Sequence, residues 1–358
     1  MVERSKRFAG QRERALYSDR KMIGLIDVDG KLPNLALMKI SNYYKSMGEQ
    51  VEFVRPDAKK TEYEKIYASA IFTKSKGDCE KLNEYYGDRI EIGGTGWDIE
   101  KRLPTEIENM KPDYDLYTAD MIYPKIKGIM TKERKKAKAQ QIVNAGMGFT
   151  SRGCIRNCPF CMVPKKEGCF RQDSEIKDII NPRGNVLVLS DNNLTADPYC
   201  IDKLHEIRDR KLIVDINQGC DVRLMTPEIA QAMSEVHHLR SLHYAWDLMG
   251  FEKQVLEGIK VMSKFIPASK HMCFCLVGFN TSFEEDMYRV KKLSELGVRP
   301  YIMRYNERRD DIRLNHFARW VNAFIYKVVP NFEDYEPWKR DRSKYYCDNG
   351  QISINDYI

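Results

Sequence analysis

The sequence contains no long apolar run: none of its hydrophobic stretches approaches the roughly 18 residues that a membrane span needs. Residues 1–21, MVERSKRFAGQRERALYSDRK, also lack the apolar segment of a secretory signal. With 42% hydrophobic and 31% charged residues, the composition is typical of a soluble globular protein. We therefore expect a cytoplasmic protein that has no membrane partner.

The cysteines do not suggest a disulfide framework. Ten cysteines in a cytoplasmic protein favour metal ligands, catalytic thiols or small buried side chains. Seven of them are scattered: Cys79, Cys169, Cys200, Cys220, Cys273, Cys275 and Cys347. The other three, Cys154, Cys158 and Cys161, lie within eight residues in the stretch FTSRGCIRNCPFCMVP. This cluster is the strongest functional signal in the chain.

The net charge of +7 is concentrated in two places. Residues 1–21 carry seven Lys and Arg against three acidic residues, and residues 125–138 carry seven against one, so the remainder is slightly acidic. Such stretches either grip an anionic partner or form solvated tails and hinges. We interpret them as a basic tail, 1–21, and a basic linker, 125–145.

The chain of 358 residues is long enough for two domains. Between residues 22 and 124, apolar runs such as MIGLIDV alternate with helical patterns such as the one that contains Leu37 and Ile40 and stops at Gly48. This alternation predicts a small doubly wound parallel sheet. Its ligand crevice is expected beyond the strand ends, near DVDG (27–30) and GGTG (93–96).

A second alternating series occupies residues 146–330. Its predicted strands are 146–150, 185–190, 212–216, 240–246, 271–279 and 299–305. Helices are predicted between them, one of which opens with a capping box of Ser282 and Glu285. Six strand–helix repeats predict a partial (β/α)6 barrel of the TIM type, with its chemistry at the C-terminal strand ends. The polar and aromatic segment 331–358 has no assignable pattern, and we treat it as a C-terminal tail.

Three close thiolates raise the question of which metal needs them. Thiolates select zinc or iron–sulfur clusters, both of which ordinarily take four ligands. Three cysteines on one loop therefore predict a cluster with one iron left open to a substrate. The stretch CIRNCPFC resembles the Cys-x3-Cys-x2-Cys signature of the radical S-adenosylmethionine (radical SAM) superfamily, including the aromatic Phe160. The alternative is a zinc knuckle with Cys169 as the fourth ligand.

This resemblance implies that Cys154, Cys158 and Cys161 each bind one iron of a [4Fe–4S] cluster. It implies that S-adenosylmethionine binds the fourth iron through its amino and carboxylate groups. An electron from a reducing partner such as flavodoxin or ferredoxin would then cleave this cosubstrate to methionine and a 5′-deoxyadenosyl radical. The radical would abstract hydrogen from a substrate, with an outcome that the sequence leaves open.

Three strand ends match the positions at which this family holds the cosubstrate. The stretch LSDNN stands where the family usually has Gly-Gly-Glu, although a strand-end turn would have the same composition. The stretch INQGCDVR offers groups for ribose hydroxyls and a carboxylate, or is a turn with an incidental arginine. The stretch CLVGFN resembles the strand that passes the adenine. The candidate cosubstrate contacts are Phe160, Ser190, Asp191, Asn192, Asn217, Gln218, Arg223, Val277, Gly278 and Asn280.

Three other features each allow two interpretations. His243 and Asp247 end the fourth barrel strand at the same mouth, but His243 could equally be a hydrogen-bonded core histidine. Cys273 and Cys275 point to one face of a strand, which suits an apolar barrel layer better than a second cluster. Cys347 is either inert or a methyl-accepting or radical-quenching thiol.

The order of the two domains resembles the radical SAM subfamily that has an N-terminal cobalamin-binding-like domain, and GGTGWDIEKRLPTEI resembles part of that domain. Its usual cobalt ligand is the histidine of an Asp-x-His-x-x-Gly loop. The first histidine of this chain is His205, and the corresponding loop, DVDGKLPN, contains Asp27, Asp29 and Gly30 instead. We favour a scaffold that binds substrate or a partner without cobalamin, with bound cobalamin as the alternative.

The sequence thus predicts a radical SAM enzyme that modifies a small molecule or a peptide. One alternative is modification or methylation of nucleic acid, drawn by the basic stretches and by Arg304, Arg308 and Arg309. Another is a non-catalytic iron–sulfur or zinc protein. The substrate, the reaction outcome and the oligomeric state are not determined by the sequence.

Overall fold

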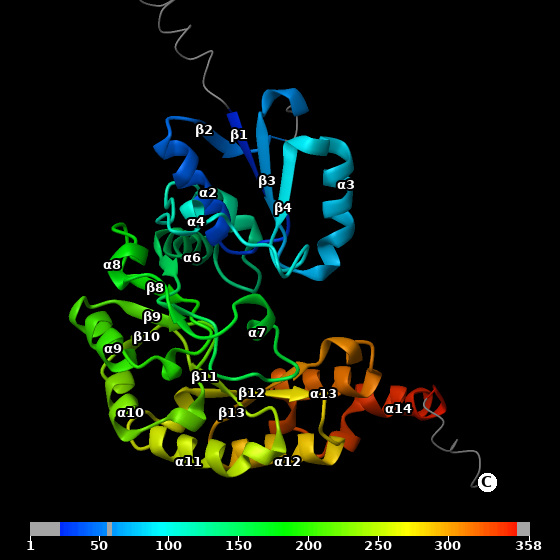
Figure 1. The fold of residues 1–358 in the computed structure, drawn as a ribbon. Coiled ribbons are helices and arrows are strands. Elements are labelled where there is room, and N and C mark those ends of the chain that lie inside the picture. Colours follow the sequence, from blue (N-terminus) through cyan, green and yellow to red (C-terminus); the bar gives the residue numbers. More distant parts are fainter. Residues whose placement is uncertain (1–21, 56–58, 349–358) are drawn as a thin grey trace, which may run out of the picture. The chain divides into compact units, whose positions relative to one another are not determined.

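The structure is a computed structural model that describes residues 22–55 and 59–348. Its contacts divide the chain into two compact units, described one by one below (Figure 1). The first comprises residues 1–148 and 177–187, and the second comprises 149–176 and 188–358. The expected basic tail, 1–21, lies outside the described residues.

The first unit contains a parallel sheet in the order β2-β1-β3-β4. Its strands are β1 (Met22–Asp27), β2 (Gln50–Phe53), β3 (Lys65–Ser69) and β4 (Ile90–Gly93). Its helices are α2 (Leu35–Ser46), α3 (Lys76–Tyr86), α4 (Thr105–Glu108), α5 (Ala119–Ile122) and α6 (Lys132–Asn144). The chain order reverses between β1 and β3, and a ligand crevice is expected at such a point.

Both faces of this sheet are covered by apolar side chains. One core cluster contains Leu25 of β1 and Leu37 of α2, and the other contains Ile66 of β3 and Cys79 of α3. Helix α2 begins where Asn34 accepts a hydrogen bond from the N–H of Leu37 at 3.2 Å, and this cap satisfies one of the free N–H groups of the first turn. The first unit is therefore an α/β structure in which helices pack on both faces of a parallel sheet, as the alternating pattern predicted.

The segment expected to be a basic linker is largely helical. Helix α6 contributes Ala139 and Val143 to the core cluster that also holds Leu25. Its lysines and arginine lie on the other sides of the helix, so the charge count did not reveal the short apolar stripe at three- and four-residue spacing. Charge alone is a weak indicator of a linker in this chain.

The predicted strands of the second series form two sheets. One has the order β10-β9-β8-β5 and the other is the parallel sheet β11-β12-β13. The strands are β5 (Gly146–Gly148), β8 (Val186–Leu189), β9 (Ile213–Ile216), β10 (His237–His238), β11 (Leu242–Ala245), β12 (His271–Val277) and β13 (Arg299–Arg304). A parallel bridge between Cys220 and Tyr244 continues the series from the segment after β9 to β11. This succession is compatible with a partial α/β barrel.

Helices separate these strands, as expected for repeated strand–helix units. They are α8 (Ile176–Ile179), α9 (Cys200–Asp209), α10 (Pro227–Ser234), α11 (Glu252–Met262), α12 (Phe283–Glu295), α13 (Ile312–Asn322) and α14 (Glu336–Asp348). The predicted capping box at the start of α12 is confirmed: Ser282 and Glu285 exchange hydrogen bonds of 3.2 and 2.7 Å. The buried Arg289 of this helix bonds the carbonyl of Trp246 at 2.5 Å, which ties α12 to the end of β11.

Part of the segment that the sequence left unassigned belongs to the core of the second unit. Phe332 and Trp338 are buried and their rings stack at 5.3 Å, and Phe332 also contacts Phe317 of α13. Of the expected C-terminal tail, residues 349–358 lie outside the described part, as do the side chains of residues 343–348, including that of Cys347. Aromatic residues in a polar context gave no periodic signal, and so tertiary packing was needed to place them.

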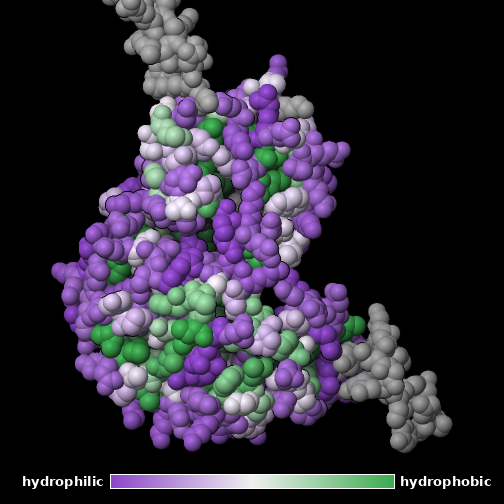
Figure 2. Space-filling model, viewed as in Figure 1, coloured by the Kyte–Doolittle hydropathy of each residue, from purple (hydrophilic) through white to green (hydrophobic). Residues whose placement is uncertain are grey.

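Most of the surface in Figure 2 is hydrophilic, with hydrophobic residues in separate patches over the second unit. Within residues 22–55 and 59–348, no helix combines the length and apolar character that crossing a bilayer requires.

The fold predicts an acid-sensitive core at His271, which is fully buried at the start of β12. Burial lowers the pKa of His271 from 6.5 to about 4. Between these two values the unfolded chain binds the proton more readily, so the stability is complete above about pH 6.5 and is lost as the pH falls towards 4. We expect the melting temperature to fall over this range and to fall less steeply in His271→Gln.

Thermal unfolding followed by circular dichroism between pH 7 and 4.5 measures this effect. The matched control is His205→Gln, because the His205 side chain is 41% exposed. Equal slopes for His271→Gln and the wild type would contradict the assignment.

Candidate functional site

The three cysteines lie on one loop of the second unit, 153–170, which a short antiparallel ladder closes at its base. Strands β6 (Ser151–Arg152) and β7 (Arg171–Gln172) form this ladder. The N–H of Cys161 bonds the carbonyl of Cys158 at 3.0 Å, so the second and third cysteines share a turn. The short helix α7 (Val163–Lys166) follows at once. The spacing of the motif is therefore held in a closed loop.

N–H groups point at two of the three sulfurs. The backbone N–H of Arg156 lies 3.4 Å from Sγ of Cys154, and that of Val163 lies 3.4 Å from Sγ of Cys161. The side-chain Nδ2 of Asn193 lies 3.5 Å from Sγ of Cys154. Donors of this kind stabilise thiolates and tune iron–sulfur clusters. The chemistry of this donor set fits a cluster.

The electrostatics of the loop show that the thiols influence one another. Burial raises the pKa of Cys158 and Cys161, and the neighbouring cysteines raise it further. The Arg223 guanidinium acts in the opposite direction on the pKa of Cys158. Three thiolates held this close repel one another, so a bound cationic centre would stabilise the arrangement.

Among residues 22–55 and 59–348, no group of three His, Cys, Asp or Glu side chains is arranged to hold a metal ion. A zinc ion gathers its thiolates around one centre, whereas each iron of a four-iron cluster takes its own cysteine. Cys169, the expected fourth zinc ligand, is exposed.

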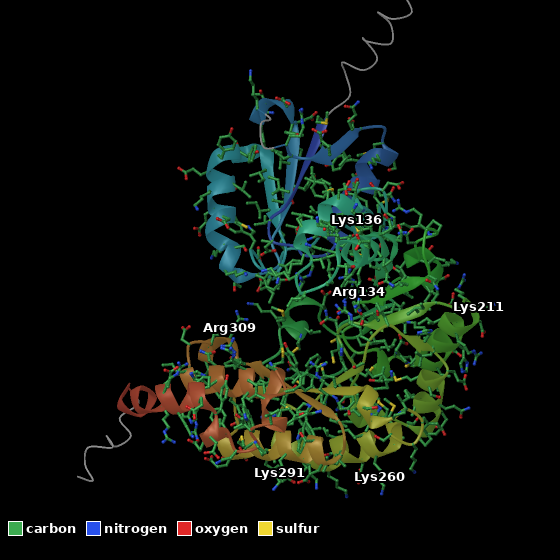
Figure 3. The ribbon with its side chains drawn as sticks, turned by 180° about the vertical axis from the view of Figure 1, so that it is seen from behind. Arg134, Lys136, Lys211, Lys260, Lys291 and Arg309 are labelled. Atoms are coloured by element: carbon green, nitrogen blue, oxygen red, sulfur yellow. The ribbon has the colours of Figure 1, made fainter. Side chains whose placement is uncertain are left out.

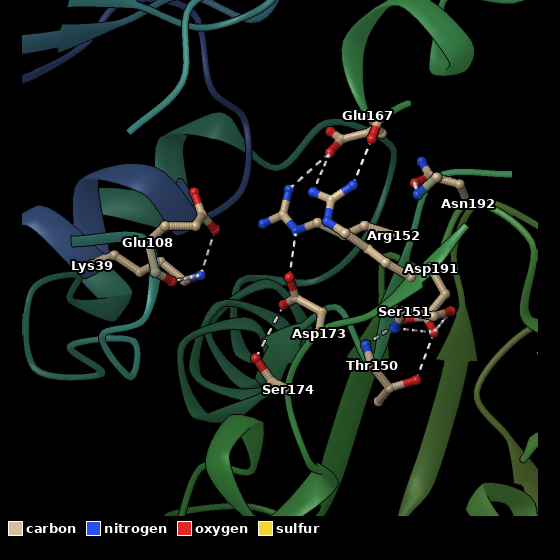
Figure 4. Close-up of polar contacts among 12 residues, drawn as sticks. Lys39, Glu108, Thr150, Ser151, Arg152, Glu167, Asp173, Ser174, Asp191 and Asn192 are labelled. Atoms are coloured by element: carbon tan, nitrogen blue, oxygen red, sulfur yellow. Dashed lines mark hydrogen bonds and ion pairs between the residues drawn. The ribbon is translucent and has the colours of Figure 1, made fainter. Parts of the chain in front are cut away.

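A buried carboxylate fixes the start of the cysteine loop (Figure 4). Asp191, just beyond β8, has no exposed surface and accepts four hydrogen bonds. Its donors are the N–H and hydroxyl of Thr150, at 2.7 and 2.5 Å, and the N–H and hydroxyl of Ser151, at 2.9 and 2.8 Å. Burial raises the pKa of Asp191 and these bonds oppose the rise. Asp191 therefore positions the loop in this structure, a role that the sequence did not suggest.

The next two residues continue this support. Asn192 accepts a hydrogen bond from the N–H of Gly153 at 2.9 Å, one residue before the first cysteine. Asn193, which donates toward Cys154, also accepts a bond from the Thr195 hydroxyl at 3.0 Å. Ser190 is half-buried at the end of the strand. Residues 190–193, which the sequence allowed to be either a strand-end turn or a cosubstrate contact, form a turn whose side chains support the cysteine loop.

The arginine expected to meet a cosubstrate carboxylate already has a carboxylate partner. Arg223 binds Asp221 through Nε at 2.6 Å and Nη2 at 2.9 Å, and stacks on Phe251 at 4.6 Å. Arg156 of the cysteine loop binds the same Asp221 at 2.9 Å. Asp221, which the sequence analysis passed over, therefore links the loop to the segment after β9.

The remaining predicted contacts on this segment, Asn217 and Gln218, are exposed. No structural role for either side chain emerges from its surroundings. Their position directly after β9 still leaves them free to meet a ligand.

Asp247, just after β11, is a half-buried carboxylate near the cysteines. Leu276 donates its N–H to Oδ1 at 3.0 Å. Burial raises the pKa of Asp247, while Arg289 and Arg223 lower it, and its charge in turn raises the pKa of Cys158 and Cys161. The sequence placed Asp247 at the mouth but gave no reason to assign it a role at the site. Its effect on the pKa of Cys158 and Cys161 supplies that reason.

At the end of β12, the predicted cosubstrate contacts can meet a ligand through their backbone more readily than through their side chains. Val277 is fully buried, and Gly278 has φ +80°. This φ favours glycine, and a Cβ at Gly278 would stand 2.6 Å from the flexible tip of the Leu314 side chain. A pocket of about 190 Å³ lies beside Gly278 and Phe279, and Asn280 is exposed.

Aromatic rings run from the cysteine loop to the last strand. Phe160, between the second and third cysteines, contacts Phe279 with ring centroids 5.4 Å apart. Phe279 in turn contacts Tyr305 at 5.0 Å. The loop is thus packed against the ends of β12 and β13.

Two of the ambiguous features are clarified by burial. Cys273 and Cys275 are both fully buried, and burial raises the pKa of Cys273 well above its usual value, which agrees with an apolar barrel layer. His243 is 9% exposed, and its Nδ1 has no hydrogen-bond partner among the described residues. His243 is therefore not the fully hydrogen-bonded core histidine of the simpler interpretation.

In the first unit, two aspartates hold the loop after β1. The carboxylate of Asp29 accepts the N–H groups of Ile71 and Phe72 at 2.8 and 2.9 Å, so it ties this loop to the loop after β3. The carboxylate of Asp27 accepts bonds from the N–H of Gly30 at 2.9 Å, within the same loop, and from Lys125 at 3.2 Å.

No protein-family model matches this sequence, and no curated protein matches it either. Among solved structures, the crystal structure of Streptococcus suis SuiB bound to precursor peptide SuiA shares 12% identity with a TM-score of 0.38. The match covers 54% of this chain and 52% of that one, about half the length of each. This likeness is too low to indicate a shared fold.

The geometry predicts that Gly153 is essential for the cysteine loop. It has φ +77°, and a Cβ there would lie 2.2 Å from the carbonyl oxygen of Cys169. We expect Gly153→Ala to disrupt iron–sulfur incorporation and to lower stability by about 1–3 kcal/mol. Iron and sulfide per chain after anaerobic reconstitution, with thermal unfolding, measure both effects.

Gly168→Ala is the matched control for this substitution. Gly168 has φ +74° but no atom within 4 Å of its Cβ position, so it carries backbone strain without a clash. Equal iron contents for the two variants would refute the role of Gly153.

The buried carboxylate gives a second prediction. Asp191→Asn replaces an acceptor by an amide donor that faces N–H and O–H groups, so we expect a loss of about 1–3 kcal/mol in stability and poorer cluster incorporation. Denaturant unfolding and iron content measure these losses. Asp209→Asn, whose side chain is 66% exposed, should leave both unchanged. A fully stable Asp191→Asn protein would show that the four hydrogen bonds are dispensable.

Proposed function

We propose that this protein is a radical SAM enzyme in which Cys154, Cys158 and Cys161 bind a [4Fe–4S] cluster and S-adenosylmethionine is the cosubstrate. The observation that supports it most strongly is the closed loop of three partly buried cysteines, two of which accept N–H···S contacts. The loop is also held from beneath by the buried Asp191 and Asn193 and by the half-buried Asn192.

When bound, the cluster would supply the electron that cleaves the cosubstrate to a carbon radical able to abstract hydrogen. The chain itself has three tasks. Asp191, Asn192 and Asn193 hold the loop at the strand ends. Arg223 moderates the negative charge around Cys158. The packed rings of Phe160, Phe279 and Tyr305 cover one side of the loop and limit the access of water.

Of the predicted cosubstrate contacts, Gly278 stays available, and Asp247 joins it. Asp247 and the backbone at Gly278 lie at the ends of adjacent strands. A half-buried carboxylate can accept hydrogen bonds from an amine or from ribose hydroxyls. Asp191 has no free surface for this purpose. The substrate in this proposal is a small molecule or a peptide.

The first unit, in this proposal, does not bind cobalamin through its loop after β1. The Asp29 carboxylate is occupied by two backbone N–H groups, so a change in this loop would be needed before it could meet a metal. Binding of substrate or of a partner remains the proposed role of this unit.

Anaerobic reconstitution followed by a cleavage assay tests the function. We expect about four iron and four sulfide per chain. With dithionite, the protein should convert S-adenosylmethionine to methionine and 5′-deoxyadenosine, and Cys154→Ser, Cys158→Ser and Cys161→Ser should each abolish this conversion. Cys169→Ser is the matched control and should keep both the cluster and the cleavage, because Cys169 is exposed on the same loop.

Two outcomes would reject the proposal. One zinc per chain without cleavage would support a non-catalytic zinc protein, and a cluster without cleavage would support a non-catalytic iron–sulfur protein. The absorption spectrum of added cobalamin should be the same with and without the protein, and cobalamin should not alter the cleavage rate. A shifted cobalamin spectrum would overturn the proposal for the first unit alone.

A further inference from the structure

An open groove of about 600 Å³ lies along the outer side of the last strand, β13, and the helix α13 that follows it. This volume falls in the range of small-ligand sites. The strand contributes Tyr301, Met303 and Arg304, and the helix contributes Asn315 and Arg319. Arg309, from the loop between them, completes the rim. All of these residues belong to the second unit.

The groove is strongly basic. Arg304, Arg309 and Arg319 line it, and no acidic side chain does so among the described residues. The only side-chain bond found for these three arginines within the described part of the chain is from Arg304 to the carbonyl of Arg309, at 3.0 Å. Nearby acidic groups pair elsewhere, as Asp311 does with Arg308 at 2.6 Å. Three guanidinium groups without carboxylate partners are suited to an oxyanion.

The groove is not built to accept an additional strand. Asn322 occupies the outer edge of β13, where its Oδ1 accepts the N–H of Ile302 at 2.7 Å and its Nδ2 donates to the carbonyl of Ile302 at 3.1 Å. Pro300 on the same strand has no N–H to offer. Both features block the pairing of an extended peptide with this edge. The ligand must therefore be held through side chains.

The uncharged part of the groove restricts the ligand further. The side-chain oxygen of Asn315 is buried and has no hydrogen-bond partner among the described residues, so a hydroxyl or amide of a ligand would satisfy it. Tyr301 and the 47% exposed Met303 add an aromatic and a thioether side chain to the lining, on which a planar group can pack. An anion, a hydroxyl and a planar apolar group in one compound of this size describe a nucleotide.

We propose that this groove binds a phosphate ester of nucleotide size, with its phosphate on Arg304, Arg309 and Arg319. Arg304 is the last residue of β13, and the next residue, Tyr305, belongs to the row of rings that reaches Phe160 on the cysteine loop. The bound compound is therefore the substrate, or the anchoring part of the substrate, of the reaction. This last step rests on the proposed function, whereas the binding itself does not.

Isothermal titration of the full chain with uridine 5′-monophosphate, without reconstitution, tests the binding. A pyrimidine probe avoids competition with an adenosine site. Uridine, inorganic phosphate and a hexaglutamate peptide are titrated in parallel. We expect the monophosphate to bind more tightly than uridine and hexaglutamate, and its affinity to fall about tenfold in Arg304→Ala, Arg309→Ala and Arg319→Ala.

The matched controls remove exposed positive charges elsewhere. Figure 3 shows Lys260 of α11 and Lys291 of α12 at the lower rim of the second unit, away from Arg309. Lys260→Ala and Lys291→Ala should bind the monophosphate within twofold of the wild type. These controls separate a built site from general attraction to a basic protein.

The proposal is overturned if the monophosphate does not bind, if uridine binds equally well, if hexaglutamate binds more tightly, or if the arginine and lysine variants behave alike. Circular dichroism confirms that each variant is folded, which is expected since all three arginines are exposed. Because the titration needs no cluster, binding without cleavage would reject only the proposed function. Cleavage without binding would reject only this groove.

Discussion

The candidate site depends on one buried carboxylate. Asp191 gathers two N–H groups and two hydroxyls from Thr150 and Ser151, and so it fixes where the chain leaves the first barrel strand and enters the cysteine loop. A carboxylate without exposed surface is costly unless it is fully hydrogen-bonded, and four donors satisfy it here. These bonds position the start of the loop that carries the three thiols.

The groups around the cysteine loop act in opposite directions on the pKa of its thiols. Burial and mutual repulsion disfavour thiolates at Cys158 and Cys161, and Asp247 adds to this, while Arg223 opposes it at Cys158. Arg223 is itself restrained by Asp221, which also binds the loop through Arg156. In the proposed function, a positively charged cluster bound to the three cysteines would favour their thiolates and offset these shifts.

The two units solve different problems with similar elements. The first ties its loop after β1 to its loop after β3 through Asp29, and Asp27 holds the loop after β1 through Gly30. The second leaves its strand ends lined with buried polar groups, and it leaves three arginines beside its last strand without carboxylate partners among the described residues. This contrast agrees with the proposed function, which has its chemistry in the second unit.

The sequence by itself indicated most strands and the helices between them, though not α6 or α14, because apolar periodicity is local. It also indicated the cysteine loop, because three thiols so close together have few other uses. It also placed the capping box at Ser282 and an Asp/Asn turn at residues 190–193. It could not tell that Asp191 faces inward, that Arg223 is held by Asp221, or that α6 and Trp338 are parts of a core. Those facts were decided only by the tertiary structure, because each depends on partners distant in the chain, and burial and pairing are properties of the folded neighbourhood rather than of the residue.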